Sequence, residues 1–115
     1  MSRDLSRFPQ DENGDVLWRM HESGDDLSKI REVDFSVVFP TEQQALDFSV
    51  RVLRAGHRVQ QSRFMEQPEG LTWDVSVSSH MVPTHLQVTQ FELFLADAAM
   101  AHGGRNDGWG CFAQA

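Results

Sequence analysis

The sequence lacks the features that mark exported and membrane-spanning proteins. Cys111 is its only cysteine, so no disulfide can form within the chain, and a reducing compartment is expected. No uninterrupted apolar stretch approaches the roughly 18 residues that a membrane span requires. The first residues, Met-Ser-Arg-Asp, lead into no apolar segment that could direct export. We therefore expect a soluble cytoplasmic protein that does not associate with membranes.

Basic residues are also scarce. The chain has 17 acidic and 10 basic side chains, which gives a formal net charge of -7. Lys29 is the only lysine, so any basic surface would be built from arginine. A negative charge of this size argues against binding along the phosphate backbone of a nucleic acid or on an anionic membrane. We expect no direct contact with nucleic acid.

Catalytic and metal-binding motifs are absent as well. Nothing in the sequence resembles a nucleophile elbow, a phosphate-binding glycine loop or a metalloprotease helix. His80 and His85 are separated by a proline and have no third ligand at a recognised spacing. Cys111, within Trp-Gly-Cys-Phe, is expected to pack as a small apolar residue. The sequence predicts a protein that is not an enzyme and holds no cofactor or metal.

The 115 residues contain two segments in which apolar and polar residues alternate, the period of a strand with one buried face. These segments cover residues 33–39 and 71–77, and each leads into Pro-Thr-x-x-Gln, at Pro40 and again at Pro83. In such a capping box the threonine oxygen accepts from amides of the first helical turn while the glutamine reaches back. The signal predicts a helix after each strand.

An amphipathic pattern follows each capping signal. The expected buried stripes are Ala45, Phe48, Ser49 and Val52 in the first helix, and Val88, Phe91, Leu95, Ala98 and His102 in the second. Gly56 is expected to end the first helix and Gly103-Gly104 the second, because the residue after a helix often adopts positive φ.

Further strands are expected at residues 57–65 and 106–113, with a turn at 67–70. The resulting order βαββαβ predicts an α+β, ferredoxin-like fold, in which one antiparallel four-stranded sheet carries both helices on a single face. We expect an extra helix before this unit, capped by Asp15 and ended by Gly24. Residues 1–12 show no periodicity and should form a flexible leader to a single domain, 13–115.

The even-numbered side chains of the two central strands should face away from the helices. They are Asp34, Ser36, Thr72, Asp74, Ser76 and Ser78. RNA-binding sheets of this topology stack bases on aromatic side chains at such positions, and aspartates there would repel phosphate. RNA binding through this face is not expected.

Two sets of charged side chains are candidates for contact with a protein partner. The acidic set is Asp25, Asp26, Asp34 and Asp74, and the basic set is Arg51, Arg54 and Arg58 within an acid-free stretch, residues 48–65. Arginines of this kind can hold an acidic segment or a phosphate by paired hydrogen bonds. The alternative is an ordinary solvated surface that acids elsewhere balance.

Several short motifs resemble the RraB family of regulators of ribonuclease E activity. They are Gly24-Asp25-Asp26-Leu27, Arg31-Glu32-Val33-Asp34-Phe35, Trp73-x-Val75-x-Val77, Met81-Val82-Pro83 and, most distinctive, Gly103-Gly104 followed by Asp107-Gly108-Trp109. The resemblance covers about residues 13–112 in the family's order. It implies a ferredoxin-like domain and a non-catalytic inhibitor that binds ribonuclease E and changes which transcripts are degraded.

The motif residues suit structural roles. Gly24 and Gly103 would end helices, Asp107-Gly108 would make the tight turn that opens the last strand, and Trp109 would supply a large buried face. The namesake inhibitors carry longer, strongly acidic tails, whereas this chain reaches Ala115 without an acidic run. If inhibition depends on acidic segments that meet the arginine-rich scaffold of ribonuclease E, this chain would lack it.

The alternative function is a domain that binds a small-molecule or regulatory ligand. Its mark would be a pocket at the sheet edge, lined by apolar side chains and a few convergent polar groups. In either case we expect a monomer or a weak homodimer.

Overall fold

The computed structural model describes residues 3–63, 73–111 and 114, and the side chains of residues 61–63 lie outside this description. The elements in chain order are α1 (Glu12–Glu22), β1 (Arg31–Phe39), α2 (Glu42–Arg54), β2 (Arg58–Arg63), β3 (Trp73–Met81), α3 (His85–Met100) and β4 (Arg105–Cys111). The predicted turn at 67–70 and parts of three predicted strands, at 64–65, 71–72 and 112–113, lie outside the described residues.

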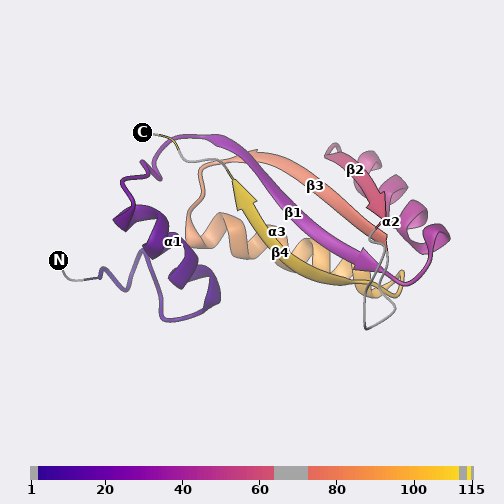
Figure 1. The fold of residues 1–115 in the computed structure, drawn as a ribbon, viewed down its shortest axis with the longest axis horizontal. Helices are drawn as coiled ribbons and strands as arrows, with labels where there is room; N and C mark the ends of the chain where they lie inside the picture. Colours follow the sequence, from indigo (N-terminus) through magenta and orange to yellow (C-terminus); the bar gives the residue numbers. More distant parts are fainter. Residues whose placement is uncertain (1–2, 64–72, 112–113, 115) are drawn as a thin grey trace.

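The four strands form one antiparallel sheet in the order β2-β3-β1-β4. β1 and β3 pair along their whole length, with Phe35 opposite Val77, and β2 and β4 form the two edges. Figure 1 shows α2 and α3 behind this sheet and α1 at one end of it. The predicted α+β class, with its four-stranded antiparallel sheet and a preceding helix, is confirmed.

The main core lies between the sheet and the two helices that cover it. Phe35 of β1 and Val77 of β3, two of the odd-numbered residues, are 2% exposed or less and share one cluster with Phe48 of α2 and Leu95 of α3. Because side chains alternate across a strand, this places both helices on the same face of the sheet. We call the whole cluster of buried residues between the sheet, α2 and α3 the main core.

In both capping signals the threonine caps the N-terminus of its helix. Thr41 Oγ1 accepts from the Gln44 amide at 3.2 Å, and Thr84 Oγ1 accepts from the Gln87 amide at 3.2 Å. The predicted stripe on α2 is buried, and on α3 Val88, Leu95 and Ala98 are buried while Phe91 packs against the core from a half-buried position. His102, the last residue of the predicted stripe, lies beyond the end of α3 at Met100 and is half-buried. Apart from His102, the periodicity predicted both helices and the faces that they bury.

The first helix begins earlier than predicted. Asp11, not Asp15, is its N-cap, and the Asp11 carboxylate accepts from the Gly14 amide at 2.7 Å. Both aspartates suit a helix start, and the structure selects the one that adds a turn. The added turn brings Asn13 opposite α3, where its amide nitrogen donates to Glu92 Oε1 at 2.6 Å.

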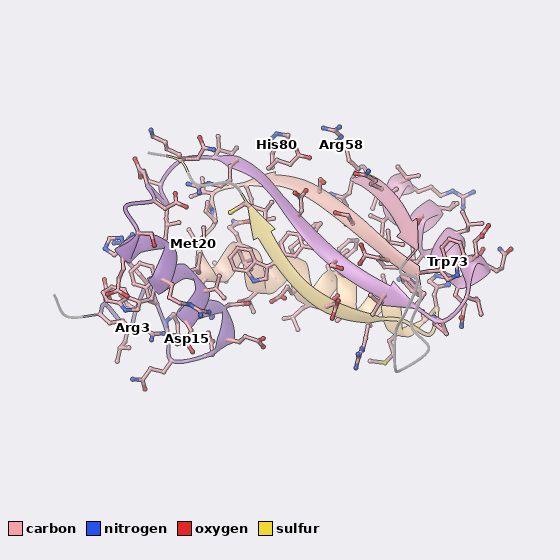
Figure 2. The ribbon with its side chains drawn as sticks, in the orientation of Figure 1. Arg3, Asp15, Met20, Arg58, Trp73 and His80 are labelled. Atoms are coloured by element: carbon pink, nitrogen blue, oxygen red, sulfur yellow. The ribbon has the colours of Figure 1, made fainter. Side chains whose placement is uncertain are left out.

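A second, smaller cluster lies beneath α1. Phe8, Leu17 and Leu27 are 2%, 1% and 7% exposed and form it together, and we call it the α1 cluster. Phe8, in the segment predicted as a leader, contacts Trp18 with ring centroids 5.4 Å apart. Figure 2 shows Arg3 next to Asp15 on the outside of α1, and their ion pair measures 2.8 Å.

Candidate protein-interaction surface

The structure separates the acidic residues that sequence reasoning grouped together. Asp34 is exposed on the sheet face away from the helices, and its Oδ1 accepts from the Ser78 hydroxyl at 2.6 Å. Asp74 lies on the same face, on β3, four residues before Ser78. It is only 8% exposed, and its carboxylate accepts a hydrogen bond from the Ser36 hydroxyl. A partner could therefore reach Asp34 directly, whereas Asp74 is largely withdrawn from solvent.

Asp74 is electrostatically unusual because it is an acid in a buried position. Burial raises the pKa of the Asp74 carboxyl above its usual value, the Ser36 hydrogen bond opposes the rise, and the nearby Asp107 carboxylate adds to it. The residue of β1 that pairs with Asp74 is Val38, which is 3% exposed although it lies on the polar face of the sheet. This end of the open face is thus less polar than the alternation predicted.

Asp25 is buried in an ion pair. Both of its carboxylate oxygens accept from Arg31 Nη1 at 2.8 Å, and each side chain is 2% exposed. Asp25 Oδ1 also accepts from the Gln114 amide at 3.1 Å. The neighbouring Asp26 is exposed, and its carboxylate accepts a hydrogen bond from the Ser28 hydroxyl. Asp25 therefore organises a loop, and Asp26 is the member of this acidic pair that a partner could contact.

The predicted arginines lie on two different faces. Arg51 and Arg54 are exposed on α2, among the exposed apolar side chains Leu46, Val50 and Leu53. Arg58 instead lines a groove of about 410 Å³ on the open sheet face together with Glu32 and Asp34. Its guanidinium is 3.8 Å from Glu32, and Figure 2 shows it pointing away from the body of the molecule. The arginine stretch is therefore not one basic surface.

An acidic cleft that sequence reasoning did not find lies between α1, α3 and β4. Its volume is about 390 Å³, and its lining residues are Glu12, Asn13, Val16, Glu92, Asn106, Asp107, Gly108 and Trp109. Three carboxylates come from three elements that are far apart in the sequence. The only signal in the sequence was the Asp-Gly-Trp motif itself, which we interpreted as a turn.

A second hollow is mainly apolar and lies between the N-terminal segment, α1 and the start of α3. Its volume is about 440 Å³, and its walls include Phe8, Leu17, Leu27, Val82, Pro83 and Leu86. Arg7 and His85 are among the polar residues that complete it. We call it the apolar pocket.

The histidines and the cysteine do not combine into a reactive centre. His85 Nε2 is 2.7 Å from Asp11 Oδ2, which ties the N-terminal segment to α3. Burial raises the pKa of the Cys111 thiol, so the reactive thiolate is disfavoured. Within residues 3–63, 73–111 and 114, no group of three or more His, Cys, Asp or Glu could hold a metal ion. None of the described helices is long and apolar enough to cross a membrane.

The model of one protein family matches residues 10–111 of this chain, and that family is described as RraB, regulator of ribonuclease activity B. The chain belongs to the RraB family. The match includes all three helices and all four strands of the structure. None of the curated proteins matches the chain. The family assignment identifies a regulator of ribonuclease activity in general.

The Asp107-Gly108-Trp109 segment of β4 has a different geometry from the one we predicted. Asp107 and Gly108 do not precede the strand but lie inside it, where the pairing with β1 slips between Phe35 and Val37. Phe35 pairs with Trp109 and Val37 with Asn106, so the two motif residues bulge opposite a single residue of β1. Gly108 has a φ of 104°, which a bulge of this kind requires and a side chain would strain.

The other glycines and the tryptophan that carried the resemblance occupy positions set by backbone conformation or packing. Gly24 directly follows the C-cap of α1 with a φ of 91°, and Gly103 lies two residues beyond the C-cap of α3 with a φ of 78°. A Cβ on Gly104 would clash with the ring of Phe39, so the backbone there needs glycine. Trp109 packs against both the main core and the α1 cluster, and its Nε1 donates to Asn13 Oδ1 at 2.9 Å. The bulge thus aims Trp109 at α1 and leaves Asp107 exposed in the acidic cleft.

Proposed function

We propose that this protein is a non-catalytic regulator that binds ribonuclease E and alters RNA turnover by occupying a surface of that enzyme. The observation that carries the proposal is the RraB family match across residues 10–111. The strand order β2-β3-β1-β4, with α2 and α3 on one face, also supports the ferredoxin-like fold that we infer for the family domain.

The acidic cleft is the contact surface that we favour. Its carboxylates project from Glu12, Glu92 and Asp107, and the aromatic ring of Trp109 forms part of the wall. Carboxylates next to an aromatic face suit an arginine side chain, which forms paired hydrogen bonds and stacks on flat rings. A basic segment of a ribonuclease would therefore find complementary charge here without an acidic tail on the regulator.

The predicted residues Asp26 and Asp34 are exposed but lie outside the acidic cleft, and Arg51, Arg54 and Arg58 remain the basic alternative. The groove on the open sheet face combines both signs, because Asp34 and Arg58 share it. A partner surface of mixed charge would suit this groove, whereas a purely basic segment would be repelled by Arg58. The two surfaces can be separated by variants that neutralise one of them at a time.

The test measures binding of the full chain to purified ribonuclease E by biolayer interferometry, together with the rate of RNA cleavage. We expect saturable binding and slower cleavage. The double variant Glu12→Gln and Asp107→Asn should weaken binding by about tenfold or more, since it removes two charges from the cleft. Asp34→Asn, an exposed change on the other surface, serves as the control and should bind as the wild type does.

Circular dichroism would verify that each variant folds. If the wild-type chain binds ribonuclease E no better than an unrelated protein of equal net charge, the regulatory proposal is wrong. If Asp34→Asn weakens binding and the cleft variant does not, the contact lies on the open sheet face instead.

A further inference from the structure

The apolar pocket is a large hollow with an apolar floor. Its floor consists of side chains that are otherwise withdrawn from solvent: Phe8, Leu17 and Leu27 are 7% exposed or less, and Pro83 is less than 2% exposed. The pocket is open to solvent on one side and measures about 440 Å³. That volume falls within the range of about 300–1,000 Å³ typical of small-molecule sites.

Polar contacts fix the positions of the two segments that form the walls of the pocket. The N-terminal segment is fixed by Arg3, which donates to the carbonyl oxygens of Phe8 and Pro9 and to Asp15. On the opposite wall, the start of α3 is fixed to the same segment by the contact between Asp11 and His85. These contacts fix the N-terminal segment relative to the start of α3 and so position the two apolar walls.

The rim carries one exposed arginine, Arg7, which lies outside the ion pairs of the described residues. Ser6 and Ser28, two hydroxyls of the rim, donate to Asp4 and Asp26 within their own turns. The Arg7 guanidinium carbon lies 4.9 Å from the centre of the Phe8 ring. A fork of donors above an apolar floor is complementary to a planar anion that carries an apolar group.

The surroundings limit the number of charges on such a ligand. Asp4 and Asp11 both belong to the N-terminal segment that forms one wall, and their carboxylates would repel a second negative charge. The pocket has room for a chain or ring, and Arg7 is the only arginine among its described lining residues, so one carboxylate can pair with a guanidinium there. We propose that the apolar pocket binds a small amphipathic molecule with a single carboxylate, which pairs with Arg7 while its apolar part contacts Phe8, Leu17 and Leu27.

This inference is independent of the ribonuclease proposal, because the pocket and the acidic cleft share no lining residue. The experiment is an NMR titration of the full ¹⁵N-labelled chain with octanoate, well below the concentration at which it forms micelles, and with octanol in parallel. We expect one-site saturation by octanoate, with amide shifts concentrated in residues 6–8, 27–28 and 82–86. Octanol should bind more weakly, since it brings the apolar chain without the charge.

Arg7→Gln tests the charge contact. It should weaken octanoate binding by about tenfold and leave octanol binding unchanged, because only the carboxylate uses the guanidinium. Arg54→Gln, an exposed arginine on α2, is the matched control and should change neither. Val82→Phe should fill the pocket and abolish binding of both probes, with circular dichroism used to verify the fold.

Three results would overturn the proposal. The first is the absence of saturable octanoate binding to the wild-type chain. The second is a set of amide shifts that centres on the exposed apolar side chains of α2 instead of on the pocket walls. The third is equal affinity for octanol and octanoate with no effect of Arg7→Gln, which would show an apolar surface without a carboxylate site.

Discussion

The main core and the α1 cluster bury side chains of similar chemistry on very different scales. Among the described residues, the sheet, α2 and α3 enclose fourteen buried side chains, whereas α1 packs on a cluster of three, Phe8, Leu17 and Leu27. Hydrogen bonds hold α1 in place to a greater extent. The Asn13 side chain forms hydrogen bonds with Trp109, Thr89 and Glu92, and His85 contacts Asp11. Where apolar area is small, position is fixed by directional bonds instead.

The largest expected effect comes from the main core. Phe48 is fully buried and its ring lies 4.9 Å from that of Phe39. Phe48→Ala should reduce the free energy of unfolding by about 3–5 kcal/mol, because it removes apolar contacts and leaves a cavity. Urea denaturation followed by circular dichroism would measure it. A change below about 1 kcal/mol would contradict a single cooperative core.

The second effect comes from the buried ion pair between the two regions. Arg31→Leu leaves the Asp25 carboxylate buried without its partner and should reduce the free energy of unfolding by about 3 kcal/mol. Adding Asp25→Asn removes that isolated charge while keeping an acceptor for the Gln114 amide, so the double variant should recover much of the loss. A double variant no more stable than Arg31→Leu alone would show that the charge is not the cause.

A smaller and local effect is expected at the contact between α1 and β4. Asn13→Ala deprives Trp109 Nε1 of its acceptor and should cost about 1–3 kcal/mol. The loss should appear in hydrogen exchange as faster exchange of α1 amides, with β1 and β3 amides little changed. Glu22→Gln, an exposed change on the same helix, is the control. Equal acceleration in α1 and the central strands would mean that the two regions unfold together.

The smallest effect concerns Asp74, on the open face of the sheet. Its raised pKa means that the folded state binds the proton more tightly than the unfolded state, so the ionised carboxylate reduces stability above that pKa. Asp74→Asn should therefore be more stable than the wild type at pH 7. The difference should shrink as the pH falls through the raised pKa towards the ordinary value of 3.8. A difference that stays constant with pH would contradict this origin.

The sequence predicted the main core better than it predicted the surfaces. Alternation in β1 and β3, the helical stripes and the two threonine caps depend on neighbours in the chain, and they appear in the structure as expected. The surfaces depend on side-chain pairing in loops, on irregular strand pairing and on residues far apart in the sequence. Pairing with Arg31 buried Asp25, and a bulge displaced Asp107 from the turn that its Asp-Gly sequence suggested. The acidic cleft could not be predicted, because Glu12, Glu92 and Asp107 meet only after folding.

The hydrogen bond from the Asp26 amide to the carbonyl of Gln114, 2.7 Å long, keeps Gln114 beside the loop that follows α1. α1 lies at one end of the molecule, and α2 lies at the other (Figure 1). A protein fixed to a sensor through a C-terminal tag would therefore present α2, with Arg51 and Arg54, to the solution. The same attachment would place the apolar pocket near the support, so ligand binding is better measured on the untethered chain.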